Sequence, residues 1–417
     1  MFDFAKRKIC ANQLTSIMKG IAALAPTLLL TLILTSCMSD GYTDTAAGKS
    51  DTYINLNVST PTAQARAKNA PATTAETSGK LGQDETNPSP DTEEKITSIR
   101  VWAFKSDTER ATATPIGFKS ETNLSAKGSH NVSMMITRKN AETLGKIDLY
   151  ILLNAESEGV LDGKDCIKMT RADLEALVIK NKFGIADGTA QTTVVPDAGL
   201  PISRVIKELD VTNNIKDNAT EAAQHSINIP LIRAVSKLHF FFTRKNVKDT
   251  EGVEVTKIEV NEGIVPTQSS VFPTATTDAN KETDGLTGNL TSLTYLNEKM
   301  TFGGVATGDI KPVTDPTSYI RKPGQNAEDY ITKLRGATTE CHLSYLRETG
   351  EKLTGTIFFK LNKSGAEKQA TFSISNAYRN HEMVVYGYFL GDKESTLTLK
   401  YYVANWDEKK ATNIEFN

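Results

Sequence analysis

The chain is poor in cysteine, histidine and aromatic residues, and neither sign of charge dominates. Its 417 residues include 4 cysteines and 5 histidines, and aromatic residues make up 7%. So few Cys and His side chains exclude a disulfide-stapled or zinc-rich scaffold. The 48 Lys and Arg nearly balance the 50 Asp and Glu, leaving a net charge of −2. Because that balance gives no broad positive field, we predict that nucleic acid is not a partner.

Motifs for common enzyme and cofactor sites are also lacking. The sequence has no GxxxxGK[ST], HExxH, paired CxxC or GxSxG motif. The histidines are scattered without metal-ligand spacing: His130, His225, His239, His342 and His381. No two carboxylates are marked as an acid and base pair. We therefore predict a non-enzymatic chain with no cofactor and no metal, and a structural or binding role.

The start of the chain has the features of an export signal. Basic residues at 6–8 precede a mostly apolar stretch at 21–34. As a helix this stretch would be about 21 Å long, shorter than the roughly 30 Å hydrocarbon core of a membrane. The sequence Leu34-Thr35-Ser36-Cys37 then resembles a bacterial lipobox. We predict a lipoprotein signal peptide over 1–36 and acyl chains on Cys37; an ordinary cleaved signal with an accidental cysteine is the alternative.

Two cysteines remain in the body of the exported chain. Cys166 and Cys341 are 175 residues apart in the sequence. A disulfide between them requires the fold to bring their Cα atoms within about 7 Å. We predict two isolated buried thiols, with a bridge as the alternative.

A strand and a long polar loop follow the lipobox. In residues 52–59 the side chains of Ile54, Leu56 and Val58 share one face, and polar residues alternate with them. This period of two predicts a strand with one buried face. Residues 60–95 are dominated by Thr, Ala, Pro, Ser, Gly, Asn and Glu, which predicts a mobile, exposed loop. A loop of that length inside a compact domain is often functional.

The rest of the chain is strand-rich. One helix is predicted at 172–182, opened by a capping box at 170–173, and residues 266–340 are expected to form long connections and edge strands. Many short strands and few short helices predict a mostly β protein with two β-sandwich-like domains, at 37–228 and 229–417. Further strands are expected at 96–104, 132–136, 147–153, 229–243, 257–260, 356–361, 370–374, 383–390 and 396–404.

Four features together resemble the fimbrillin family, the lipoprotein subunits of type V pili of Gram-negative anaerobes of the gut and mouth. They are the lipobox, the first strand with the loop Thr60-Pro61-Thr62-Ala63-Gln64-Ala65-Arg66-Ala67, the run Arg233-Ala234-Val235-Ser236-Lys237-Leu238, and Arg379-Asn380-His381 with Val403-Ala404-Asn405-Trp406 near the terminus. The likeness covers most of the chain, and each motif is short. It implies two transthyretin-like β-sandwich domains and a structural, adhesion-supporting subunit of a cell-surface fimbria.

The resemblance also implies how such a subunit matures. An arginine-specific protease cuts in the loop behind the first strand and frees the subunit from its lipid. Arg66 is the candidate cleavage residue, with Ala67 as the new N-terminus, because Arg66 is the only arginine between Cys37 and Arg100. Cleavage at a lysine or at another arginine is the alternative. The outer membrane would hold the lipid-anchored precursor, and the trimmed subunit would enter an extracellular fimbrium.

Loss of the first strand is then expected to leave a groove that a neighbouring subunit's C-terminal strand fills. We expect the removable strand to lie at the edge of its sheet, so that its loss strips one edge of hydrogen bonds and uncovers the partners of Ile54, Leu56 and Val58. Donor and acceptor lie on different surfaces, so the contact is head-to-tail and builds a fibre. The partners implied are other fimbrial subunits and host or bacterial surface ligands. The donor candidates are Leu397, Leu399, Tyr401, Val403, Ile414 and Phe416.

Three other interpretations stay open. An anchor subunit would keep its lipid and its first strand permanently. A surface glycan-binding lipoprotein would expose aromatic side chains, for which Tyr401, Tyr402 and Trp406 are the candidates, although strand aromatics are more often core residues. A lipid-anchored hydrolase would gather carboxylates in a cleft.

Overall fold

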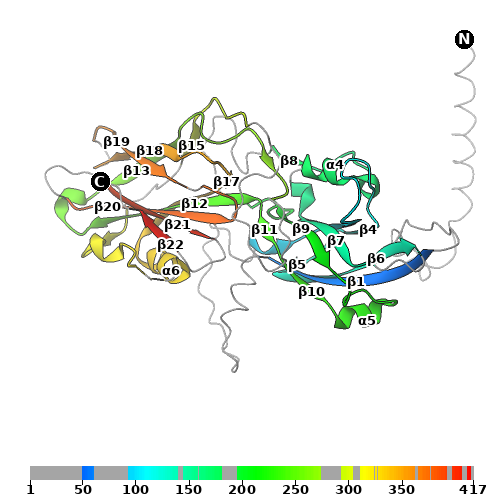
Figure 1. Ribbon diagram of the computed structural model, residues 1–417. Helices are drawn as coiled ribbons and strands as arrows, with labels where there is room; N and C mark the ends of the chain where they lie inside the picture. The colour runs from blue at the N-terminus through cyan, green and yellow to red at the C-terminus, as the bar shows by residue number, and fades with distance from the viewer. Residues whose placement is uncertain are drawn as a thin grey trace, which may run out of the picture. The chain divides into compact units, whose positions relative to one another are not determined.

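Strands supply most of the regular structure in the computed structural model of this chain (Figure 1). The structure describes residues 49–60, 93–139, 144–157, 159–180, 195–273, 293–303, 310–323, 325, 327–361, 365–375, 377–391, 397–405 and 411–414. The prediction of a mostly β chain with several sheets and few short helices is confirmed. No helix within these ranges is long and apolar enough to cross a membrane.

The first part of the chain forms two sheets that share one core. A three-stranded sheet has the order β10-β1-β6, and a five-stranded sheet has the order β11-β9-β7-β3-β4. The strands are β1 (Lys49–Ser59), β6 (Ser129–Lys139), β10 (Ile227–Pro230), β11 (Ile232–Arg233), β9 (Ile202–Asp210), β7 (Lys146–Leu153), β3 (Ile99–Lys105) and β4 (Gly117–Glu121).

The central strand of the five-stranded sheet, β7, is buried on both faces. In β7, Leu149, Ile151 and Leu153 belong to the cluster shared with β1, whereas Tyr150 and Leu152 face a second cluster beneath α4. This explains why residues 149–153 of β7 form an unbroken apolar run and not an alternation.

The helix α4 (Arg171–Glu175) begins where the sequence predicts and ends early. The side chain of Thr170 accepts a hydrogen bond from the Asp173 backbone N–H, and Asp173 in turn accepts from the Thr170 backbone, which completes the capping box. The prediction that the helix continues to residue 182 is wrong. β8 (Val178–Ile179) pairs with β14 (Ser269–Ser270), and this tertiary pairing overrides the helical spacing.

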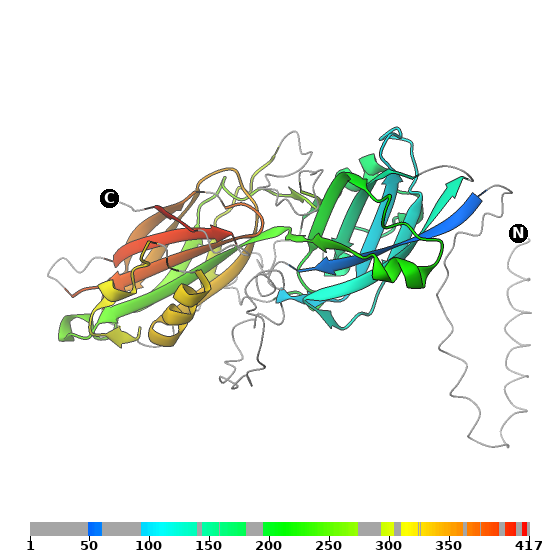
Figure 2. The ribbon, with the colours of Figure 1, turned by 60° about the horizontal axis from the view of Figure 1, so that its bottom comes forward.

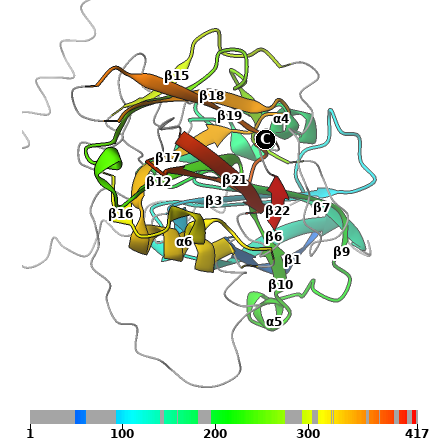
Figure 3. The same ribbon diagram turned by 90° about the vertical axis from the view of Figure 1, so that its left-hand side faces the viewer.

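The second part of the chain forms another pair of sheets. β12 (Val235–Lys245), β20 (His381–Phe389), β21 (Leu397–Asn405) and β22 (Ala411–Ile414) follow β16 (Pro312–Val313) in one sheet, and β17 (Thr339–Arg347) also pairs with β12. The other sheet has the order β15 (Met300–Gly303), β13 (Glu254–Val260), β18 (Leu353–Lys360) and β19 (Lys368–Ile374). Figure 3 shows the two sheets as layers, with α6 (Ala327–Ala337) on the far side of the first. One apolar cluster fills the space between the sheets, and a tyrosine-rich cluster lies under α6.

Most predicted strands are present, and several elements were not predicted. No strand is predicted where β4, β9 and most of β17 lie. The stretch 266–340, for which connections and edge strands are predicted, also holds the helix α6. The chain passes from the first group of sheets to the second between β11 and β12, at residues 233–235, close to the predicted boundary at 228, which stays a prediction. The remaining short elements are β2 (Lys95–Ile96), β5 (Ala126–Lys127), η1 (Ala155–Ser157), η2 (Cys166–Lys168), α5 (Ala219–Gln224), η3 (Lys248–Thr250) and η4 (Pro316–Tyr319).

Candidate functional site: the first strand and its neighbours

The first strand, β1, has neighbours on both of its edges. It pairs antiparallel with β6 along its whole length, from Lys49 opposite Lys139 to Ser59 opposite Ser129. Its last four residues also pair in parallel with β10, where Leu56 lies opposite Ile227. In Figure 2 the blue strand crosses this part of the molecule between its neighbours.

The expectation that residues 53–59 form an edge strand is therefore wrong for the C-terminal part of the strand. Toward β10, the first part of β1 has only an isolated bridge, in which Tyr53 N donates to Lys216 O at 2.7 Å and Lys216 N donates to Tyr53 O at 3.0 Å. From Leu56 onward the strand is interior. β10 is 171 residues away from β1 along the chain, so the local periodicity of the first strand cannot reveal this pairing.

The inward face of β1 is completely buried. Ile54, Leu56 and Val58 all have 0% exposure and belong to one apolar cluster, so the predicted face is confirmed. Across the β6 edge, Leu56 lies opposite Val132 and Ile54 opposite Met134, which are also buried. At roughly 1.5–3 kcal/mol per fully buried side chain, the three residues contribute on the order of 5–9 kcal/mol of burial.

The outward face of β1 is polar and partly covered by α5. Asn55 donates from Nδ2 to Ser226 Oγ at 2.5 Å, and Asn57 donates from Nδ2 to Asn228 Oδ1 at 2.9 Å. The helix itself is capped by Asn218, whose side chain accepts from Glu221 N at 2.8 Å. Figure 1 shows α5 beside β1. These side-chain hydrogen bonds therefore fix the register of β1 against β10, in addition to the apolar burial on its other face.

The exit of β1 is fixed by three further hydrogen bonds. Thr60 donates to Gly128 O from both its backbone N, at 2.7 Å, and its hydroxyl, at 3.2 Å. Leu231 N donates to Ser59 O at 3.0 Å. The segment thus ends in a defined place at residue 60, and the stretch that contains the candidate cleavage residue follows it directly.

Several predicted site residues lie outside the described residues. Cys37, Arg66, Ala67, Trp406 and Phe416 belong to this group. The lipidation site and the cleavage site are therefore predictions from the sequence.

The C-terminal donor candidates divide between two strands. β21 lies between β20 and β22, and the side chains of Leu397, Tyr401 and Val403 are buried in the chain's own core, with Leu399 packed against it. β22, which ends at Ile414, pairs only with β21 and closes the described part of the sheet. Within one molecule, both edges of β21 are therefore paired with neighbouring strands, and β22 lies at the edge of the described sheet.

The aromatic residues that a glycan site would need are buried where they are described. Tyr401 and Tyr402 are 7% and 3% exposed. Tyr402 packs edge-on against Tyr330 of α6, with ring centroids 5.1 Å apart. The guanidinium of Arg321 lies over the ring of Tyr402, 5.0 Å from its centroid. Both tyrosines therefore serve the core, which leaves them no face for a sugar.

A group of carboxylates with little exposure does occur beside β12: Glu93 before β2, Glu340 of β17 and Glu382 of β20. Two residues of β12, Lys237 and His239, accompany them. Lys237 Nζ lies 2.8 Å from Glu93 and 3.6 Å from Glu382. His239 lies between Glu382, 3.2 Å from its Nδ1, and Glu340 on its Nε2 side.

This pairing keeps the carboxylates ionised. Burial opposes ionisation of Glu382, but Lys237 and His239 outweigh it and lower its pKa to about 2. The pKa of Glu340 is lowered in the same way, against burial, by His239 and Arg335. A general acid needs a pKa near the working pH. The geometry suits a buried structural network better than the acid and base pair of a hydrolase.

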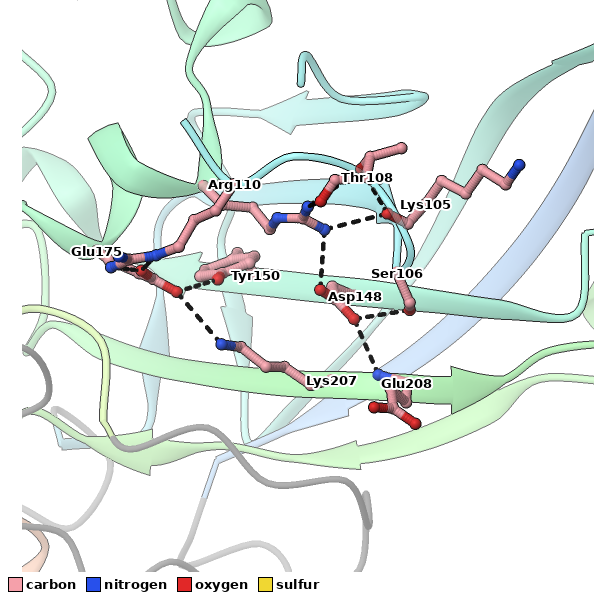
Figure 4. Close-up of polar contacts among 10 residues, drawn as sticks. Lys105, Ser106, Thr108, Arg110, Asp148, Tyr150, Glu175, Lys207 and Glu208 are labelled. Carbon is pink, nitrogen blue, oxygen red and sulfur yellow. Dashed lines mark hydrogen bonds and ion pairs between the residues drawn. The ribbon is translucent and has the colours of Figure 1, made fainter. Parts of the chain in front are cut away.

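A second buried network joins β7 to α4 (Figure 4). Glu175 accepts a hydrogen bond from the Tyr150 hydroxyl at 2.6 Å, lies 3.6 Å from Lys207 Nζ and pairs with Arg110. Burial and this bond to Glu175 raise the pKa of Tyr150 above its usual value. Beside it, Arg171 donates to Asp148 at 3.0 Å. All members have partners, which is the condition under which buried charges are tolerated.

Two smaller expectations can be compared with the structure. Cys166 and Cys341 are both free and partly buried, so the alternative of a bridge does not hold here. Among the described side chains, no three His, Cys, Asp or Glu residues are grouped so that they could hold a metal ion.

Sequence reasoning missed the partners of the first strand. The alternation of Ile227, Ile229 and Leu231 is the signal for β10, whereas the sequence alone predicts one long strand from 229 to 243. The cap at Asn218 followed by Glu221 carried the signal for α5.

Comparisons with known proteins give likenesses of fold only. No family model matches the sequence, and no curated protein matches it. A protein provisionally assigned to cell adhesion, from Parabacteroides distasonis, is 13% identical with a TM-score of 0.45, covering 85% of this chain and 96% of that one. A fimbrial assembly protein from the same species is 13% identical with a TM-score of 0.38, covering 87% and 99%. A fimbrial protein from Bacteroides vulgatus is 10% identical with a TM-score of 0.37, covering 74% and 92%.

Proposed function

We propose that this chain is a structural subunit of a cell-surface pilus, exported as a lipoprotein, trimmed after Arg66 and polymerised by strand exchange. The observation that carries the proposal is the placement of β1. A strand that supplies a complete buried strip, Ile54, Leu56 and Val58, ends only seven residues before the single arginine of the region. One cut after Arg66 would separate that strand, with the predicted lipid on Cys37, from the remaining sheets.

The interior position of β1 makes the resulting acceptor stronger than an edge strand would. Release of β1 would unpair β6 along eleven residues and β10 along four, and would uncover the apolar floor between them. Unpaired backbone groups and exposed apolar side chains both favour insertion of a new strand. Main-chain bonds on two sides give affinity, and the alternating pockets select the side chains.

We assign the donor to β22 and the residues behind it, in preference to β21. β21 is paired on both edges, and its removal would open the core that contains Leu397 and Val403. The last residues, 411–417, repeat the required alternation, with Ile414 and Phe416 on one face of an extended chain. Because donor and acceptor belong to different sheets of one molecule, the contact is head-to-tail and does not close. Such a fibre would carry its adhesive contacts to host or bacterial surfaces.

The test uses the exported chain, residues 37–417, incubated with an arginine-specific protease. We expect one new N-terminus at Ala67, identified by mass spectrometry, followed by oligomers in size-exclusion chromatography and fibres in electron microscopy. Arg66→Ala should block trimming, and Arg66→Lys is the matched control that keeps the charge. A trimmed product that stays monomeric at high concentration would rule out polymerisation by this route. Unchanged trimming of Arg66→Ala would remove Arg66 from the account.

The pairing of β1 with β10 also favours a second candidate, a lipid-retaining anchor subunit. An anchor needs a first strand that stays in place, and the bonds of Tyr53 to Lys216 and of Thr60 to Gly128 would hold it. The two roles differ in the mature protein on the cell surface. A stalk subunit begins at Ala67, whereas an anchor still contains residues 49–60 and the lipid.

A further inference from the structure

Arginine and lysine are distributed differently in the folded body. The structure describes the side chains of ten arginines between residues 93 and 403. Six of them are buried: Arg171, Arg204, Arg233, Arg244, Arg347 and Arg379. The lysines of the same ranges behave in the opposite way, because Lys237 alone is buried. Both residue types are normally found at the surface of proteins, so the segregation calls for an explanation.

The three half-buried arginines are held in regular structure or by aromatic contact. Arg100 lies in β3, between two strands, and pairs with Glu156 at 2.7 Å. Arg335 lies in α6 and pairs with Glu340. Arg321 lies over the ring of Tyr402. An endopeptidase needs an extended segment and an accessible side chain, and proteolytic nicking concentrates at exposed loop tips. None of these three positions offers both.

Arg110 is the exception, since it is exposed and lies in the loop between β3 and β4. Its side chain is 54% exposed, yet its guanidinium is paired with the nearly buried carboxylate of Glu175 (Figure 4). Its backbone carbonyl also accepts a hydrogen bond from Ala172 N at 3.3 Å. To bind Arg110, an arginine-specific protease would first have to break the ion pair between Arg110 and Glu175.

We propose that the folded body withholds arginine from the processing protease, and that Arg110 is a latent second cleavage site which Glu175 holds shut. The inference rests on the proposed function, because it concerns the enzyme that would trim Arg66. With the ten described arginine side chains buried, paired or held by an aromatic contact, and lysine left to supply the positive surface charge, one cut in front of the body separates β1 and leaves the subunit intact. Cleavage at the latent site would hydrolyse the Arg110–Ala111 peptide bond, consuming one water and leaving a carboxyl group on Arg110 and an amine on Ala111.

The first test adds an arginine to the surface. Lys164 is exposed in the loop after η1, so Lys164→Arg changes neither charge nor core. We expect the protease to cut the unaltered chain at Arg66 alone and the Lys164→Arg chain at both positions, read as separate N-termini by mass spectrometry. If the variant is cut at Arg66 and never at 164, the fold itself resists cleavage and the proposal is overturned. If neither chain is cut at Arg66, the proposed trimming is wrong. This outcome differs from failure of the present proposal, in which Arg66 is cut and position 164 is not.

The second test breaks the ion pair between Arg110 and Glu175. Glu175→Gln removes the charge that holds Arg110, and charge-assisted bonds are strong enough that we expect cleavage after residue 110 to rise about tenfold or more. Arg110→Lys in the same background should abolish that product. In case Glu175→Gln loosens the fold, a second variant leaves Glu175 unchanged: Ala111→Arg combined with Arg110→Lys moves the arginine by one residue. Failure of both variants to be cut in this loop, or cleavage of the unaltered chain at Arg110, would overturn the proposal that Glu175 protects Arg110.

Discussion

Arg379 and Glu348 form an ion pair in which neither side chain is exposed to solvent, with Arg379 Nε 2.9 Å from Glu348 Oε1. The same guanidinium donates to the carbonyl oxygens of Ser270, at 2.6 Å, and Val271, at 3.1 Å. Glu348 also accepts from the backbone N–H of Arg379 at 3.2 Å. The pair therefore ties the turn before β20 to β14, which pairs with β8 in a separate two-stranded sheet.

Loss of Arg379 alone should be severe. Arg379→Met would leave the Glu348 carboxylate buried without its cation, and breaking a buried pair from one side costs about 3–5 kcal/mol. Urea unfolding followed by circular dichroism measures that change in the free energy of unfolding. Arg379→Met combined with Glu348→Leu removes both charges and should recover most of the loss. Equal destabilisation of the single and double variants would show that the cost comes from packing and not from the orphaned charge.

The sequence predicts the strands well and their neighbours poorly. Ile54, Leu56 and Val58 reveal a buried face because alternation is a local property. Its pairing with β10 spans 171 residues, so the local pattern does not predict the interior position.

Buried charges were missed for the same reason. In the sequence Arg379 belongs to a short motif, and nothing near it indicates Glu348, 31 residues earlier, as its partner. Lys237 and Glu93 are likewise far apart in the sequence. A charged residue inside a strand looks like a solvent-facing position until the fold shows what covers it.

The buried strip of β1 should dominate the stability of the untrimmed chain. Leu56→Ala removes apolar volume at a fully buried position and should lower the free energy of unfolding by about 2–5 kcal/mol. Asn57→Ala, on the adjacent outward position, loses one exposed hydrogen bond to Asn228 and should cost about 1 kcal/mol or less. Urea midpoints of the two variants give the comparison. Similar losses at both positions would contradict the assignment of the inward face.

Stability should fall in acid through Glu382. Its pKa in the folded chain, about 2, lies below its usual 4.5, so its ionised form stabilises the fold. That contribution is fully present above about pH 4.5 and is lost as the pH falls toward 2. The groups that face it are Lys237 and His239 from β12 and Arg335 from α6, with Glu93 as the other partner of Lys237.

Urea midpoints measured from pH 6 down to pH 2.5 test this dependence. Glu382→Gln cannot titrate, so its stability should change less over the same interval than that of the unaltered chain. Other carboxyl groups with lowered pKa values, among them Glu340 and Glu259, supply the residual slope. A Glu382→Gln profile parallel to that of the unaltered chain would show that this carboxyl does not carry the acid sensitivity.

A synthetic first strand should compete with polymerisation. After trimming, the acceptor would present β6 and β10 with their apolar floor, and a peptide of residues 50–60 carries the side chains that fit it. Added in excess, the peptide should cap the acceptor and keep the trimmed chain monomeric in size-exclusion chromatography, with binding followed by fluorescence polarisation. The same peptide with Leu56→Asp is the matched control, since it places a charge at a position with 0% exposure. A peptide of residues 411–417 should bind to the same groove if the C-terminal tail is the donor. Polymerisation that continues unchanged in saturating first-strand peptide would mean that the subunits join through another surface, because one groove cannot hold two strands.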